Sequence, residues 1–316
     1  MGKFVARRVA RAVFVILVTA FGALVAATEW GDPFKMIGLR MQDPVTRKIL
    51  NEQFGLDQPL VVRYLHFLGK LATGDLGVDF KNRRPIGDML AETLPNTIRL
   101  ALAAILIQIV LGVTLGIYAA WRRHSFVDVV ITAAAVVITS IPLLAIGVWL
   151  RNTLSGVSVF GWTAFPLIPR SIGMPTTWLQ NLILPAIALG VGALAFTVTM
   201  TRGSMIDVLD ADYIRTARAK GLSERKVVFK HAARNALIPV AELSGMQLGA
   251  LMSGSVIIET IFQYPGLGYL FVRAMTDNNH PVMVVVAVYS VVLFVVALML
   301  VDILTAWLDP RIRTVD

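Results

Sequence analysis

Six long apolar runs constrain the fold of this chain more than any other feature of its sequence. About 20 consecutive apolar residues are enough for a helix to cross the hydrocarbon core of a bilayer. None of the runs alternates between apolar and polar residues as the strands of a membrane β-barrel do. The runs lie at about Ala12–Thr28, Thr97–Ala120, Val127–Leu150, Leu179–Met200, Ile238–Phe262 and Val282–Trp307. They predict an all-α, polytopic membrane protein with six transmembrane helices.

Prolines divide these runs into two kinds. Pro95, Pro239 and Pro281 stand at the start of the second, fifth and sixth runs, where a missing N–H costs little. Pro142 and Pro185 fall inside the third and fourth runs, where proline removes a helical hydrogen bond. We therefore expect kinks in those two helices.

The orientation of the chain is predicted from its Lys and Arg residues, because short cytoplasmic loops are enriched in positive charge. With a cytoplasmic N-terminus, 16 of the 29 Lys and Arg residues lie in the inside loops and tails, whereas the long outside segment Glu29–Pro95 carries nine basic and nine acidic residues. Both termini are therefore expected in the cytoplasm. The predicted parts are an N-terminal tail with the first helix (1–28), an extracytoplasmic segment (29–95), a five-helix core (96–308) with a cytoplasmic loop at 202–237, and a C-terminal tail (309–316).

Two features of the composition exclude other classes. The net charge of +9 is divided among separate loops that flank apolar runs, so it indicates membrane topology rather than nucleic-acid binding. The chain has no cysteine, which excludes a disulfide framework and a thiolate metal site. The basic N-terminus and short first run also resemble a signal peptide, so retention or cleavage of the first helix stays open at this point.

Small and polar residues inside the runs predict how the helices pack. Gly112 and Gly116 in the second run, and Gly245 and Gly249 in the fifth, recur every four residues and allow close helix approach, within the chain or between subunits. Polar groups in or at the ends of the runs are expected to face protein or an aqueous path, because contact with lipid is costly. These are Gln108, Gln180, Gln247, Glu242, Glu259 and Asp302.

Motifs for catalysis are absent from the sequence. There is no GxxxxGK[ST] phosphate loop, HExxH zinc pair or GxSxG nucleophile elbow. We therefore predict no catalytic residue, no metal site and no cofactor on this chain. Energy for active transport would have to come from another chain.

The basic stretch between the fourth and fifth runs predicts a short helix outside the membrane. Asp210 or Asp212 can cap its start, and Gly221 can adopt the left-handed conformation that ends it. A second helix is expected after Ser223. Ala217 and Ala219 leave a thin flank that fits a groove on a partner, while Arg215 and Arg218 can pair with acidic groups at its rim. The alternative is a solvated basic loop that only fixes topology.

This stretch resembles the loop by which permease subunits of ABC transporters dock on their ATPases, in the version of the dipeptide, oligopeptide and nickel importers. The residues concerned are Asp212, Tyr213, Ile214, Arg215, Thr216, Ala217, Arg218, Ala219, Lys220, Gly221 and Leu222, then His231 and Arg234 to Pro239. Further matches are Gly31-Asp32-Pro33, Gly55-Leu56-Asp57, Gly74-Asp75-Leu76-Gly77, Leu94-Pro95-Asn96-Thr97, Glu259-Thr260-Ile261-Phe262, Pro265-Gly266-Leu267-Gly268 and Leu308-Asp309-Pro310-Arg311. The resemblance runs nearly end to end and, because the family keeps its first helix, favours retention of Ala12–Thr28.

The resemblance implies a type I ABC importer permease fold in the bacterial inner membrane, with a cytoplasmic coupling helix at Asp212–Lys220. It also implies a second homologous permease, two ATPase domains or subunits that bind ATP and Mg, and an extracytoplasmic binding protein that lands on the segment 29–95. Where the general loop of ABC permeases has Glu-Ala-Ala, Arg215-Thr216-Ala217 stand here, so a basic contact to the ATPase is expected.

The implied substrate is a di- or oligopeptide, with nickel, heme, glutathione or another small solute as alternatives on the same machinery. Two other classes stay open from the residues alone. A secondary carrier would transport without ATP or partners, and an intramembrane hydrolase would depend on a catalytic serine or aspartate. The substrate-binding residues are not predicted.

Overall fold

The computed structural model describes residues 2–29, 58–79, 81–154, 158–159, 162–163 and 178–308. This part of the chain is helical apart from one short antiparallel strand pair, β1 (Ser158–Val159) with β2 (Trp162–Thr163). The prediction of an all-α protein is confirmed. The chain divides into two compact units: residues up to Thr97 with Pro265–Val296, and Ile98–Tyr264 with the residues from Ala297 to Val315.

The first unit contains α1 (Gly2–Glu29), α3 (Leu60–Thr73), the start of α4 (Ile86–Trp121), α11 (Leu267–Thr276) and most of α12 (His280–Leu308). Tyr64 of α3 donates a hydrogen bond to the carbonyl of Leu17 in α1 at 2.9 Å, and its ring meets Phe21 edge to face. A separate core is formed by buried side chains from α4, α11 and α12: Ile86, Leu90, Leu267, Ala274, Val282, Val285 and Val286.

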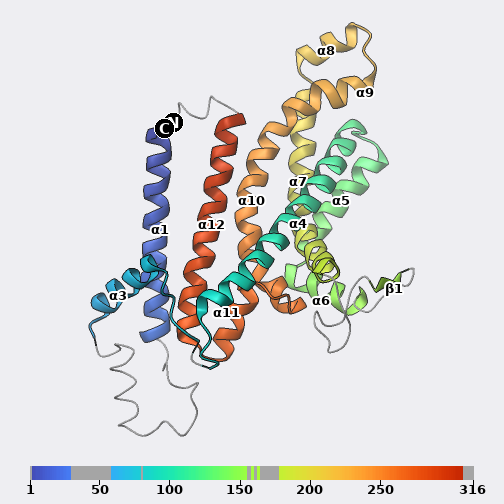
Figure 1. The fold of residues 1–316 in the computed structure, drawn as a ribbon. Helices are drawn as coiled ribbons and strands as arrows, with labels where there is room; N and C mark the ends of the chain where they lie inside the picture. Colours follow the sequence, from blue (N-terminus) through green and yellow to red (C-terminus); the bar gives the residue numbers. More distant parts are fainter. Residues whose placement is uncertain are drawn as a thin grey trace. The chain divides into compact units, whose positions relative to one another are not determined.

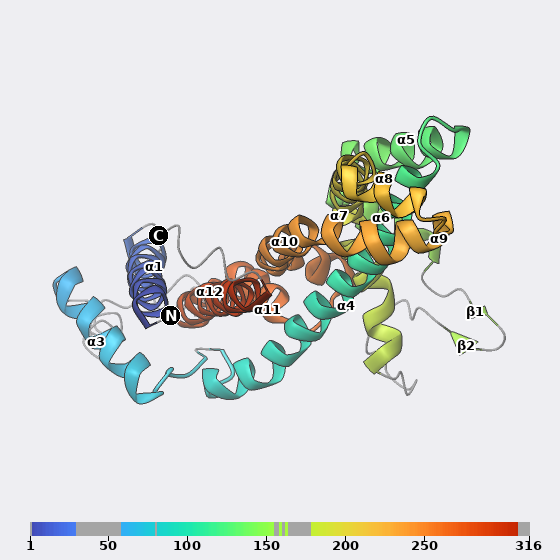
Figure 2. The same cartoon turned by 90° about the horizontal axis from the view of Figure 1, so that it is seen from above.

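The second unit is built around α7 (Trp178–Leu209). This helix packs against α10 (Ala233–Phe262), α5 (Phe126–Ser140) and α6 (Leu143–Leu154), as Figures 1 and 2 show. Beyond α7 the chain forms α8 (Asp212–Ala219), α9 (Glu224–Lys226) and the π-helix η3 (Val227–Ala232), which continues into α10. The guanidinium of Arg151 in α6 donates to the carbonyl of Ile261 near the end of α10.

In the part of the chain that the structure describes, four helical stretches are long and apolar enough to cross a membrane by themselves: Ala6–Ala26, Ile86–Trp121, Trp178–Leu209 and His280–Val301. Two bent pairs, Phe126–Ser140 with Leu143–Leu154 and Ser255–Phe262 with Leu267–Thr276, raise the number to six if each pair counts as one span. The six predicted runs therefore all fall on helices, but the third run is broken.

The structure corrects the expectations for several prolines. The helices of the third run bend by 99° at the break that contains Pro142, which confirms a kink there. The helix α7 continues through Pro185 without a break, and the expected kink there stays a prediction. Pro95 and Pro239 lie inside α4 and α10 rather than at their starts, because both helices begin before the apolar residues do. Helical hydrogen bonding does not require apolar side chains. The apolar runs therefore underestimated the lengths of α4 and α10.

Gly112 and Gly116 mediate contact between α4 and α7. A Cβ atom on Gly112 would lie 2.6 Å from Cβ of Thr197, and one on Gly116 would lie 2.8 Å from the carbonyl oxygen of Val198. Of the two readings left open, packing within the chain is the one observed for this pair. Gly245 approaches Val301 of α12 in the same way.

Replacing Gly116 by Leu is expected to separate α4 from α7 and to lower the yield of folded protein strongly, because the neighbouring atom is backbone and cannot rotate away. Overpacking of this kind costs about 1–3 kcal/mol or more. Thermal unfolding of the purified protein in detergent measures the loss. Gly203→Leu, in open space on the partner helix α7, is the control. Equal melting temperatures for the two variants would contradict the tight contact.

Candidate docking site

The predicted short helix exists as α8 and ends where the sequence indicated. Gly221 adopts a φ of +78°, and its N–H donates to the carbonyl of Arg218 at 2.9 Å. The start of α8 differs from the prediction. The N-cap residue is Ala211, which has no capping side chain. Asp212 lies in the first turn, and the carboxylate of Asp210 accepts a hydrogen bond from Arg123. Ser223 precedes α9 as expected but makes no side-chain cap.

One face of α8 is packed against the rest of the second unit. Ile214 is fully buried and Ala217 is 8% exposed. They join a core to which α4, α7, η3 and α10 contribute Ile117, Ala120, Met205, Leu209, Val227, Val228, Ala232, Ala233 and Ala236. The expectation that Ala217 forms a partner-facing flank is therefore wrong, because this side chain faces the chain's own core. Burial of α8 by apolar contacts fixes the helix to the ends of α4 and α7.

Arg218 also makes contacts within the chain. Its Nε donates to Glu224 Oε1 at 2.7 Å across the Gly221 turn, and Nη1 donates to the carbonyl of Leu209 at 3.4 Å. This side chain therefore links the end of α7, α8 and α9. The Arg218 side chain is still 39% exposed, so the expectation that it pairs with a partner's acidic rim stays a prediction.

The outward face of α8 consists of Asp212, Tyr213, Arg215, Thr216, Ala219 and Lys220, all exposed. The side chain of Arg215 is 72% exposed and lies 3.5 Å from the carboxylate of Asp212. Tyr213 is held at one edge, since its hydroxyl accepts a hydrogen bond from Asn235 of α10 at 2.9 Å. We call these six residues the α8 face.

Two ion pairs join neighbouring segments near α8. One links α5 to α7, and the other links the α4–α5 connection to the residue that follows α7. Arg202 of α7 donates to both carboxylate oxygens of Asp128 in α5, at 2.6 and 2.8 Å. Arg123 donates to both oxygens of Asp210 at 2.9 Å. This hydrogen bond, more than the general attraction of the charge, holds the pKa of Asp210 below its usual range. The residue before α8 is thus fixed to the α4–α5 connection by a salt bridge, while a second salt bridge fixes α5 to α7.

Asp128, Arg202 and Arg123 were not assigned to a site from the sequence. A signal was present, because a carboxylate within the first turns of an apolar run usually has a basic partner. The basic partner of Asp128 is Arg202, which lies 74 residues later in the chain. This pairing depends on how α5 approaches α7, which the sequence does not indicate.

Polar side chains meet inside the second unit at a second place. Gln108 of α4 is fully buried, and its Nε2 donates to Thr197 Oγ1 of α7 at 2.7 Å and to Gln247 Oε1 of α10. Glu259 is also fully buried, so Gln108 and Glu259 face protein as predicted, whereas Gln180 is half-buried. The side chains of Glu242 and Asp302 lie outside the part of the chain that the structure describes.

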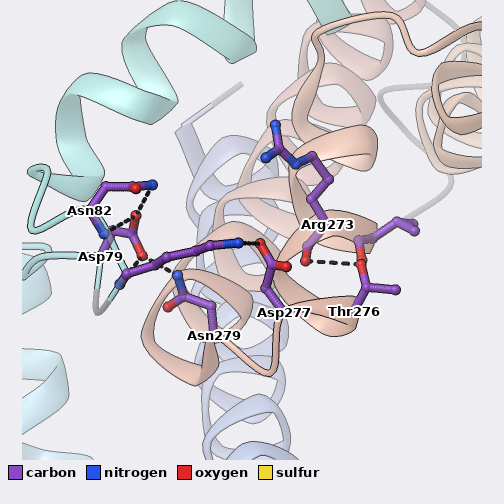
Figure 3. Close-up of polar contacts among 8 residues, drawn as sticks. Asp79, Asn82, Arg273, Thr276, Asp277 and Asn279 are labelled. Atoms are coloured by element: carbon purple, nitrogen blue, oxygen red, sulfur yellow. Dashed lines mark hydrogen bonds and ion pairs between the residues drawn. The ribbon is translucent and has the colours of Figure 1, made fainter. Parts of the chain in front are cut away.

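In the first unit, Asp79 organises the loop between α3 and α4 (Figure 3). Asp79 is 2% exposed, and its carboxylate accepts hydrogen bonds from the backbone of Lys81, the backbone and side chain of Asn82, and the side chain of Asn279. Burial raises the pKa of Asp79, but these hydrogen bonds outweigh it and hold the pKa below its usual value. The Lys81 side chain pairs with Asp277 at 3.1 Å. The predicted turn at Gly74–Gly77 immediately precedes this loop, with Gly74 and Gly77 at positive φ.

The helical fold and its apolar spans define a multi-pass membrane protein, and comparison with known proteins identifies the class. Residues 112–314 match the family of inner membrane components of binding-protein-dependent transport systems, and residues 1–101 match the N-terminal domain of the same components. The chain belongs to this family and is an inner membrane component of such a system.

Relatives match over nearly the whole chain. A Brucella abortus protein assigned to a peptide transport system as its permease is 38% identical over 99% of both chains. The oligopeptide transport system permease of Bacillus subtilis is 35% identical over 99% of this chain and 100% of its own. The glutathione transport system permease of an Escherichia coli strain is 36% identical over 90% of this chain and 89% of its own.

Proposed function

We propose that this chain is a permease subunit of an ATP-driven importer and forms half of a translocation pathway for di- and oligopeptides. The observation that carries the proposal is the match at 35–38% identity, over 99% of the chain, to relatives named as peptide and oligopeptide permeases. The chain supplies the pathway, while partner ATPase subunits supply the ATP site.

The proposed partners are a second homologous permease, two ATPase domains or subunits, and an extracytoplasmic binding protein. The α8 face is the proposed ATPase contact. Its support is geometric: the helix is anchored beneath by Ile214 and Ala217, yet presents Tyr213 and Arg215 outward. A rigidly attached helix transmits a push to the spans that hold it, because packed helices move as units.

The proposed orientation places both termini and α8 in the cytoplasm. The exposed cations around α8 support it, because Arg215, Lys220, Arg225, Lys226, Lys230 and Arg234 all lie on this side of the α7 and α10 spans. The loop organised by Asp79 precedes α4, whereas Arg122 and Arg123 follow it. A single crossing by α4 therefore puts that loop on the extracytoplasmic side.

Glutathione is the second candidate substrate, since one relative that covers 90% of the chain is named as a glutathione permease. Reconstitution of the complete complex in liposomes, with its binding protein, separates the two candidates. We expect ATP-dependent accumulation of labelled di- or oligopeptide that unlabelled glutathione does not displace. Displacement by glutathione would assign the second candidate. Accumulation that persists without ATP or the ATPase would contradict the importer and support a secondary carrier.

A further inference from the structure

Three aromatic rings form a connected row at the end of the α4 span. Tyr118 and Trp121 of α4 meet edge to face with centroids 6.3 Å apart, and Trp121 meets Phe229 of η3 in the same manner at 6.2 Å. Trp121 also packs against the core beneath α8. The outer two rings remain accessible, with Tyr118 40% and Phe229 53% exposed. The row is therefore fixed from below and open from outside.

Exposed cations surround this row. The guanidinium of Arg122 lies over the ring of Trp121, 5.7 Å from its centroid. Arg225, Lys226 and Lys230, on the same short segment as Phe229, are exposed. Within η3 the apolar residues Val227, Val228 and Ala232 face the core, so Phe229 and Lys230 are left on the outer side. We call Tyr118, Trp121, Phe229, Arg122, Arg225, Lys226 and Lys230 the aromatic–basic surface.

The nearby carboxylates are mostly engaged elsewhere. Asp210 pairs with Arg123, Asp212 with Arg215, and Glu224 with Arg218. Among the residues that the structure describes, no carboxylate pairs with Arg225, Lys226 or Lys230. The surface consequently carries uncompensated positive charge next to exposed aromatic rings.

We infer that the aromatic–basic surface binds the phosphate headgroup of an anionic phospholipid in the leaflet next to α8. Trp121 is the last residue of a span, which places its ring at the depth where Trp and Tyr favour the membrane interface. Basic residues at this depth attract anionic lipid, whereas a zwitterionic headgroup gains little from them. Exposed Phe229 and Tyr118 contact the upper acyl chain and glycerol region, so headgroup and rings are recognised together. The inference rests on the proposed function only in naming this leaflet as cytoplasmic.

Equilibrium binding of fluorescent phosphatidylglycerol to the purified complete complex in detergent tests the inference. Unlabelled phosphatidylglycerol should displace the probe, whereas phosphatidylcholine should not. Attraction by each surface cation corresponds to about fivefold in affinity, so Lys226→Gln with Lys230→Gln should weaken binding about 25-fold. Phe229→Ala, which leaves the charge unchanged, should also weaken it. The control Lys70→Gln with Arg83→Gln removes two exposed cations from the first unit and should leave binding within about twofold.

Three outcomes would overturn the inference. Equal loss in the control pair would mean that only total charge matters. Displacement by inorganic phosphate at millimolar concentration would show a phosphate site that does not need lipid. Unchanged lipid binding with loss of the ATPase from the Lys226 and Lys230 variant would assign the surface to a subunit contact. None of these readouts depends on peptide uptake, so failure here leaves the proposed function intact.

Discussion

Reversing one charge on the α8 face, by Arg215→Glu, is expected to release the ATPase from the purified complex and to abolish ATP-dependent uptake. Arg215 is 72% exposed and has only a loose contact with Asp212, so the substitution changes the outward charge without disturbing the core. A like-charge contact at an interface costs about 2 kcal/mol or more, which corresponds to about 30-fold weaker association. The measurement is the amount of ATPase that co-purifies with the tagged permease, together with uptake in liposomes.

The matched control is Arg83→Glu, which reverses an exposed cation in the loop before α4. It should leave ATPase co-purification unchanged. Arg218 is unsuitable for this test, because its contacts with Glu224 and Leu209 hold the loop itself together. Full retention of the ATPase by the Arg215 variant, at normal expression, would mean that the α8 face is not the contact.

Neutralising Asp128 alone, by Asp128→Asn, is expected to destabilise the second unit by about 2–3 kcal/mol. The Asp128 side chain is 6% exposed, so its removal leaves Arg202 with a poorly solvated charge and no partner. This value lies at or below the lower limit of the range of about 3–5 kcal/mol for breaking a fully buried pair, because the Arg202 side chain is 28% exposed. Thermal unfolding of the complex measures the loss, and the ratio of ATP hydrolysed to peptide imported measures coupling.

The double variant Asp128→Asn with Arg202→Gln is expected to recover most of the stability, because no unpaired charge remains. If the pair also carries motion from α8 to α5, the double variant should remain poorly coupled despite its recovered stability. Asp210→Asn, which breaks the exposed pair with Arg123, should have a much smaller effect on unfolding. A single Asp128 variant as stable as the wild type would contradict the importance of this pair.

The sequence alone determined the features that depend on neighbouring residues. Continuous apolar runs predicted the membrane helices, and Gly221 predicted the end of α8 at a left-handed residue, because φ preference and hydrophobicity act locally. The spacing of Gly112 and Gly116 predicted a close helix contact, since residues four apart share one face. Resemblance to the permease family was visible in the same local motifs.

Only the tertiary structure decided which side of each element is buried and which charges meet. Ala217 is a residue type that suits a partner-facing helix, yet it faces the chain's own core because α8 lies over the ends of α4 and α7. The bidentate contact of Arg202 with Asp128 joins residues 74 positions apart. Such pairings depend on how helices distant in sequence approach one another, which helical periodicity does not encode.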